Sequence, residues 1–166
     1  MKEIFKRQSI REFTSQKVEK EKIEKILRAA MQAPSGGNQQ PWEFLIIDDP
    51  EIIAKLPTIS RPAAPSGRAP LDIIMLANSE RIKHEGLWTH DLGACCENVL
   101  LEATHLGLGS VWMSIEPNEE RIEKCREMFN LPENIKPFAI IAIGYPNETK
   151  EPVNRYDETR IHYNKF

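Results

Sequence analysis

Apolar residues recur at helical spacing in two long stretches of the chain. In residues 16–32 they fall on one helical face, at Ile23, Ile26, Leu27, Ala30 and Met31. In residues 91–109 they form a longer stripe, made of Leu92, Cys95, Cys96, Val99, Leu100, Ala103 and Leu106. Both stretches therefore predict helices with one buried face. We expect Pro34 to end the first helix, since the residue before a proline avoids the helical conformation, and Gly107 or Gly109 to cap the second.

Four apolar runs predict strands, at residues 43–48, 72–78, 110–115 and 137–146. Residues 49–56 predict a short helix with Asp49 as N-cap and Pro50 at its first position, and residues 117–130 predict a longer helix. Residues 57–70 hold four prolines and one glycine, so this segment is expected to be irregular. This order of elements indicates an α/β or α+β architecture, and a chain of 166 residues fits a single domain, residues 1–166.

Composition narrows the range of partners. The formal net charge of -3 gives no support for binding to nucleic acid. The N-terminus lacks the apolar region of a secretory signal, and no apolar run has the length of a membrane span, so we expect a cytoplasmic protein. The cysteines Cys95, Cys96 and Cys125 show no CxxC spacing, and the four histidines show no ligand spacing. Buried, reduced thiols and no metal site are expected.

A basic cluster, "KRQSIREF" at residues 6–13, places two guanidinium groups on either side of a hydroxyl. Planar donors with a hydroxyl suit a phosphate monoester, because they form charge-assisted hydrogen bonds to its oxygens. Short basic clusters are also common on solvated surfaces, and this stretch alone does not separate the two interpretations.

A second candidate lies in "APSGGNQQPW" at residues 33–42. Gly36 and Gly37 allow a ligand to approach the backbone closely, while Ser35 and Asn38 offer short polar groups. The loop follows a helix C-terminus, where the partial charge is negative and a phosphate is disfavoured. We therefore expect the loop either to link two elements or to contact a neutral polar or aromatic part of a ligand.

Four blocks together carry a family resemblance: "RQSIREF", "APSGGNQQPWEFLII", "DLGACCENVLLEATHLGLGSVWM", and "PFAIIAIGYP" followed by an arginine. In this order they resemble the FMN-dependent nitroreductase family over nearly the whole chain. The resemblance implies an α+β fold with a mixed, largely antiparallel sheet flanked by helices. It also implies an intertwined homodimer with FMN at the subunit interface, and it brings no role for nucleic acid or a membrane.

The resemblance further implies roles for particular residues. The FMN phosphate and ribityl end would be bound by Arg7, Gln8 and Ser9, and the pyrimidine edge of the flavin by Arg11. The loop that the other subunit lays against the flavin would contain Pro34, Ser35, Gly36 and Asn38. The strand end that approaches flavin N5 would contain Trp112, Met113 and Ser114. The basic residue that closes on the phosphate would be Arg155, with Arg160 as the second candidate.

The roles of three parts of the chain stay open. Relatives hold the pyrimidine edge with residues that this chain lacks; Arg68 or the backbone near Gly67 are the substitutes, unless Arg68 is only exposed. Asp91 either lines the ligand cleft or caps a helix. The polar segment 147–166 still ends in aromatic residues, so we expect it to be an arm that packs on the partner subunit, with packing on its own domain as the alternative.

The activity implied by the resemblance is that of an FMN-dependent NAD(P)H oxidoreductase. NADH or NADPH would reduce the flavin, and a nitroaromatic, a quinone or a similar small acceptor would reoxidise it in a ping-pong cycle. No side chain is required as a nucleophile. Two alternatives remain: another FMN reaction on the same fold, such as reductive dehalogenation, and a flavin-storing or flavin-sensing protein without turnover.

Overall fold

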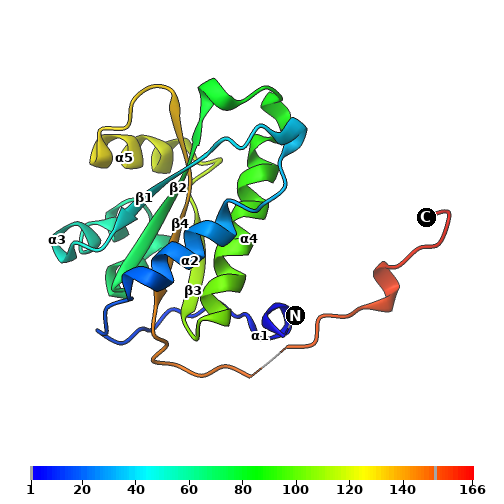
Figure 1. The fold of residues 1–166 in the computed structure, drawn as a ribbon, viewed down its shortest axis with the longest axis horizontal. Coiled ribbons are helices and arrows are strands. Elements are labelled where there is room, and N and C mark those ends of the chain that lie inside the picture. Colours follow the sequence, from blue (N-terminus) through cyan, green and yellow to red (C-terminus); the bar gives the residue numbers. More distant parts are fainter. Residues whose placement is uncertain (1, 152) are drawn as a thin grey trace.

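A four-stranded antiparallel sheet lies at the centre of the computed structural model, which describes residues 2–151 and 153–166 (Figure 1). Its strands are β1 (Trp42–Ile47), β2 (Leu71–Asn78), β3 (Gly109–Ser114) and β4 (Ile135–Gly144), in the order β1-β2-β4-β3. In register, Leu45 pairs with Ile74, and Ile140 lies between Ile74 and Met113. A parallel bridge between Ser9 and Ser110 adds the N-terminal segment beside β3.

Five α-helices accompany the sheet in the described residues: α1 (Glu3–Lys6), α2 (Lys20–Ala30), α3 (Pro50–Ile53), α4 (Trp88–His105) and α5 (Glu119–Phe129). The buried residues of α2 and α4 pack on one face of the sheet, and those of α3, α5 and the turns of residues 56–68 pack on the other (Figure 1). The three-layer arrangement is the α+β fold that the sequence predicts.

Strand β2 is buried on both faces, which explains why it is apolar at nearly every position. Ile73 and Met75 face α2 and α4, whereas Ile74 and Leu76 face the α5 layer. Asp72 is the exception: it is fully buried, and neither of its carboxylate oxygens has a hydrogen-bond partner among the described residues. Burial raises the pKa of Asp72 well above its ordinary value, so the carboxyl group favours its neutral form.

The predicted elements are present, with shifted ends. Strands begin or end within one or two residues of the expected positions, while the first long helix begins only at Lys20 and ends at Ala30, before Pro34 is reached. Met31 is 48% exposed, so its assignment to the buried face was wrong because it lies just beyond the last turn. The short helix α1 was not predicted. Gly107, with φ +77°, takes the left-handed conformation that follows α4.

Several local features of the sequence have the structure that their chemistry predicts. The Asp49 side chain accepts the Glu51 N–H at 2.8 Å, and Pro50 occupies the first turn of α3, as predicted. All three cysteines are buried free thiols, and burial raises the pKa of Cys125 to about 12. In the described part of the chain, every helix is too short or too polar to cross a bilayer.

Candidate functional site

The N-terminal segment is held against the first residues of β3. Ile10 N–H donates to the Ser110 carbonyl at 3.0 Å, next to the Ser9–Ser110 bridge. A Cβ atom on Gly109 would lie 2.7 to 2.9 Å from three atoms of Ile10, including its Cβ, which real contacts do not reach. Gly109 therefore allows the close approach that fixes the position of Ser9.

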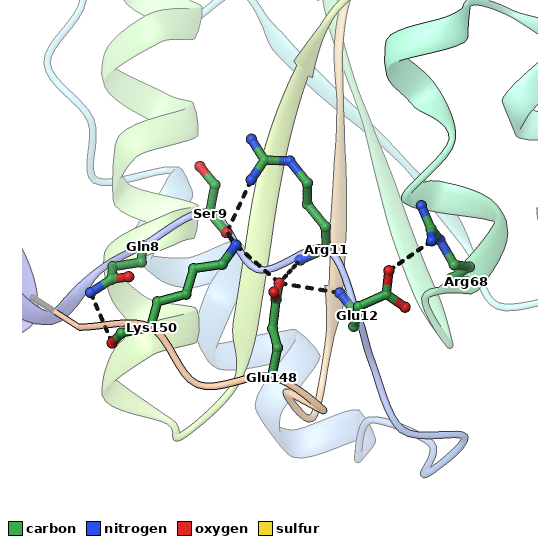
Figure 2. Close-up of polar contacts among 7 residues, drawn as sticks. All are labelled: Gln8, Ser9, Arg11, Glu12, Arg68, Glu148 and Lys150. Atoms are coloured by element: carbon green, nitrogen blue, oxygen red, sulfur yellow. Dashed lines mark hydrogen bonds and ion pairs between the residues drawn. The ribbon is translucent and has the colours of Figure 1, made fainter.

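Two cationic side chains converge on the carbonyl oxygen of Ser9 (Figure 2). Lys150 Nζ donates to this oxygen at 2.5 Å, and Arg11 Nη1 donates to it at 3.4 Å. The carboxylate beside them is Glu148, whose Oε1 atom lies 3.1 Å from Lys150 Nζ and accepts the Arg11 N–H at 2.5 Å. This hydrogen bond from the Arg11 backbone is the main reason that the pKa of Glu148 is lowered. Two cations beside one carboxylate form a site suited to an anion.

The other residues predicted to bind the phosphate have different partners. Arg7 points to α4, where its Nε atom lies 3.6 Å from Glu97 Oε1. The Gln8 amide donates to the backbone oxygens of Lys150 and Glu151, at 3.2 and 2.8 Å. Gln8 thus holds in place the segment that carries Lys150 (Figure 2). Their role in phosphate binding stays a prediction.

The loop at residues 34–38 lies at the N-terminal end of α4, where Gly36 contacts Asp91 (Figure 1). A Cβ atom on Gly36 would come within 2.5 Å of Leu87, and one on Gly37 within 2.6 Å of the His84 ring. Gly37 also has a left-handed φ of +55°. Pro34 and Asn38 are exposed and Ser35 is half-buried; the Ser35 hydroxyl accepts the Gln40 N–H at 3.1 Å, and Asn38 Oδ1 accepts from the Gln40 side-chain amide at 3.0 Å. The contact of this loop with a ligand stays a prediction.

Asp91 is buried inside the first turn of α4 rather than at its N-cap. The helix begins at Trp88, three residues earlier than predicted, so a capping role for Asp91 was wrong. Its carboxylate instead accepts the Gly36 N–H at 2.8 Å and the Gln39 side-chain amide at 2.5 Å.

The three residues predicted at the end of β3 have different surroundings. Trp112 faces the α4 layer and packs against Phe138 at a centroid distance of 5.7 Å, and its buried Nε1 has no hydrogen-bond partner in the described residues. Met113 faces the α5 layer, with 5% of its surface exposed. Ser114 is exposed, and its carbonyl accepts a hydrogen bond from Arg121 at 2.9 Å.

In one copy of the chain, the N-terminal segment and the loop contact α4 at different places. The Arg7 side chain meets α4 at Glu97, and the loop meets it at Asp91. With a rise of about 1.5 Å and a turn of about 100° per residue, these contacts lie about 9 Å apart along the helix and about 120° apart around it. The N-terminal segment and the loop therefore contact different faces of α4 in one protomer.

The arginines proposed for the C-terminal contact do not lie at the cluster. Arg155 is exposed, and Arg160 pairs with Asp157 at 3.1 Å on the segment that extends away from the body (Figure 1). Lys150 lies at the cluster, and sequence reasoning missed it. The contact of Arg155 or Arg160 with the phosphate stays a prediction. Arg68 pairs with Glu12 at 2.7 Å, which places it beside the N-terminal segment without settling its role (Figure 2).

The N-terminal segment with Ser9 and Arg11, the glycine loop and the four strands lie in residues that match a family model, whereas Lys150 lies beyond them. The model described as "Nitroreductase family" matches residues 4–89 and 67–145. This chain belongs to the nitroreductase family. Among curated relatives, a protein of Archaeoglobus fulgidus named as an NADH dehydrogenase/NAD(P)H nitroreductase is 39% identical, with 100% of this chain and 98% of the relative covered.

Solved structures of similar proteins share the whole fold with this chain. A protein of Clostridium acetobutylicum described as an NADH oxidase has 51% identity and a TM-score of 0.97, with 99% of each chain covered. A Clostridium difficile protein described as an FMN-dependent nitroreductase has 33% identity and a TM-score of 0.92, over 99% of this chain and 98% of that one. The α+β fold is thus shared along the full length of this nitroreductase-family member.

Proposed function

We propose that this protein is an FMN-dependent NAD(P)H oxidoreductase that works as a homodimer, with FMN at the subunit interface and a nitroaromatic, quinone or similar small molecule as acceptor. The observation that carries the proposal is the convergence of Lys150 and Arg11 on Ser9, in a chain of the nitroreductase family. FMN suits such a cluster, since its dianionic phosphate and its reduced ring both carry negative charge and a charged hydrogen bond is stronger than a neutral one.

The residues of this chain suit the parts of FMN. Lys150 and the Ser9 hydroxyl, with Arg7 and Gln8 in the same N-terminal segment, provide the charge and the donors that a phosphate and a ribityl chain need, while Arg11 provides the charge for the pyrimidine edge of the ring. The polar loop from Pro34 to Asn38 and the strand end from Trp112 to Ser114 suit the ring system. A buried indole N–H without a partner, as at Trp112, is a donor that a polar neighbour would satisfy.

Bound FMN would supply the two-electron redox chemistry between NADH or NADPH and the acceptor, in the ping-pong cycle that we propose. The residues of the protein orient the flavin and stabilise its reduced form. Arg11 places a positive charge where negative charge develops on reduction, and the apolar layer around Trp112 and Phe138 limits the access of water. No side chain acts as a nucleophile.

The geometry of the two groups supports dimerisation. The segment at residues 7–11 and the loop at residues 34–38 contact different faces of α4 in one protomer, so we propose that a shared site takes one group from each subunit. Residues 153–166 expose Val153, Tyr156, Ile161, Tyr163 and Phe166 while they extend from the body (Figure 1). We propose that this arm packs on the partner, whereas residues 147–151 stay on their own N-terminal segment.

Reconstitution with FMN, followed by anaerobic mixing with NADH or NADPH, tests the function. We expect a yellow dimer that is bleached by at least one nucleotide and recovers its colour when a quinone or a nitroaromatic compound is added. A protein that remains colourless in excess FMN would overturn the proposal. A yellow protein that neither nucleotide bleaches would instead favour flavin storage or sensing.

A further inference from the structure

A buried carboxylate and a buried amide link the glycine loop to two other segments. Asp91 on α4 is 4% exposed, and Gln39 at the end of the loop is 5% exposed. Asp91 Oδ1 accepts the Gly36 N–H at 2.8 Å, and Asp91 Oδ2 accepts from Gln39 Nε2 at 2.5 Å. Burial at both positions removes water as an alternative partner, so each bond matters for the local conformation.

The orientation of the Gln39 amide is fixed by its second set of partners. Gln39 Oε1 accepts the backbone N–H groups of Lys83 and His84, both at 2.9 Å. Because these two groups can only donate, the oxygen must face them and the NH₂ group must face Asp91. The four hydrogen bonds therefore form one chain with a single allowed arrangement of donors and acceptors.

The loop needs this support because its backbone is strained. Asn38 and Gln40 adopt left-handed φ values of +54° and +46°, which cost free energy in residues other than glycine and persist only where the surroundings enforce them. Leu87 and His84 lie directly over Gly36 and Gly37, at distances that leave no room for a Cβ atom. The hydrogen-bond chain holds both sides of this contact, because it binds Gly36 on one side and His84 on the other.

We propose that Asp91 and Gln39 are positioning residues for the flavin site. They hold the loop at residues 35–38 in the conformation that meets the cofactor, and they hold the segment at residues 83–87 over the same loop. Neither side chain needs to touch FMN, because each acts through the backbone groups that it fixes. The inference rests on the proposed function, since that function makes the loop part of the flavin site.

The proposal is tested by swapping the carboxylate of residue 91 and the amide of residue 39. In Asp91→Asn the new NH₂ group faces the NH₂ group of Gln39, so two donors oppose each other. In Gln39→Glu two carboxylates oppose each other. In the double variant Asp91→Asn/Gln39→Glu, the amide oxygen introduced at position 91 accepts from Gly36, and the NH₂ group beside it donates to the carboxylate introduced at position 39. The other oxygen of that carboxylate accepts from residues 83 and 84. The double variant thus restores all four hydrogen bonds with the carboxylate and amide exchanged.

Two measurements are made on each protein: amide hydrogen exchange of Gly36, Lys83 and His84 without FMN, and the FMN dissociation constant by fluorescence quenching. We expect each single variant to exchange these amides at least about tenfold faster and to bind FMN at least about tenfold more weakly, as for loss of a hydrogen bond to a charged group. The double variant should recover most of both losses. A control, Asp48→Asn/Gln16→Glu, makes the same pair of changes at exposed positions and should match the parent.

The outcomes separate the inference from the proposed function. If the parent binds no FMN, the function is wrong, while the exchange rates still report on the hydrogen-bond chain. If the single variants lose amide protection but keep the parent's FMN affinity, the positioning role is overturned. If the double variant is no better than the single variants in either measurement, the assigned pattern of donors and acceptors is wrong.

Discussion

Lys150 Nζ donates a hydrogen bond of 2.5 Å to the backbone oxygen of Ser9, a residue 141 positions earlier in the chain. The contact joins the start of the C-terminal segment to the segment beside β3, and Gln8 strengthens the junction through its bonds to residues 150 and 151. Lys150 therefore contributes both a positive charge and a fixed position to the proposed phosphate site.

Replacement of Lys150 by methionine should weaken FMN binding by about 2 kcal/mol, because a charged donor to the phosphate is lost while most of the side-chain volume remains. Fluorescence titration of the apoprotein with FMN measures the change. Lys55→Met, at an exposed position outside the cluster, should bind FMN like the parent. Equal affinities for the two variants would show that the phosphate does not lie at Lys150.

Replacement of Gly109 by alanine should destabilise the protein by about 1–3 kcal/mol, because the added Cβ overlaps Ile10 and the strand cannot shift alone. FMN affinity should fall as well, because the segment that carries Ser9 and Arg11 is displaced from its position beside β3. Urea unfolding and FMN titration measure the two effects. Gly86→Ala is the control for the stability measurement, since open space surrounds that glycine. A Gly109→Ala protein with full stability would contradict the assigned close packing.

Replacement of Arg11 by alanine should lower the reduction potential of bound flavin, because a positive charge that stabilises the anionic reduced form is removed. Anaerobic titration against a reference dye measures the potential. Arg61→Ala, which removes an exposed arginine elsewhere, should leave the potential unchanged. The same potential in parent and Arg11→Ala would remove the electrostatic role assigned to Arg11.

Asp72 should make stability depend on pH. Its pKa is raised well above the ordinary value by burial, so the folded state holds a proton that the unfolded state loses near pH 4. The free energy of unfolding should therefore fall as the pH rises from about 4 through the folded-state pKa, by about 1.4 kcal/mol per unit between the two pKa values. Asp72→Asn removes this decline, so its stability relative to the parent should improve as the pH rises.

Urea unfolding between pH 4 and pH 8 measures the dependence on Asp72. The exposed Asp48→Asn variant should follow the parent at each pH. Parallel stability curves for Asp72→Asn and the parent would show that Asp72 does not carry a raised pKa in the folded protein.

Local patterns predicted most of the elements because each has a short-range cause. The stripe from Leu92 to Ala103 specifies α4, and Asp49 with Pro50 specifies the start of α3. Helix α1 was missed because four residues are too few to show a periodic face. Met31 follows the periodicity of α2, but the helix ends one residue before it. The segments that form the candidate site were also visible, since "RQSIREF" and "APSGGNQQPW" have distinctive donors and glycines.

The sequence by itself determined the helices, the strands, the family blocks and the types of donor available for a phosphate and a flavin ring, because these depend on residues close together in the chain. Only the tertiary structure decided which distant groups meet. It brought Lys150 to Ser9, and it directed Asp91 to Gly36 and Gln39 rather than to the end of its own helix. These contacts join positions 52 to 141 residues apart, and such separations become short distances only when the sheet and its helices pack.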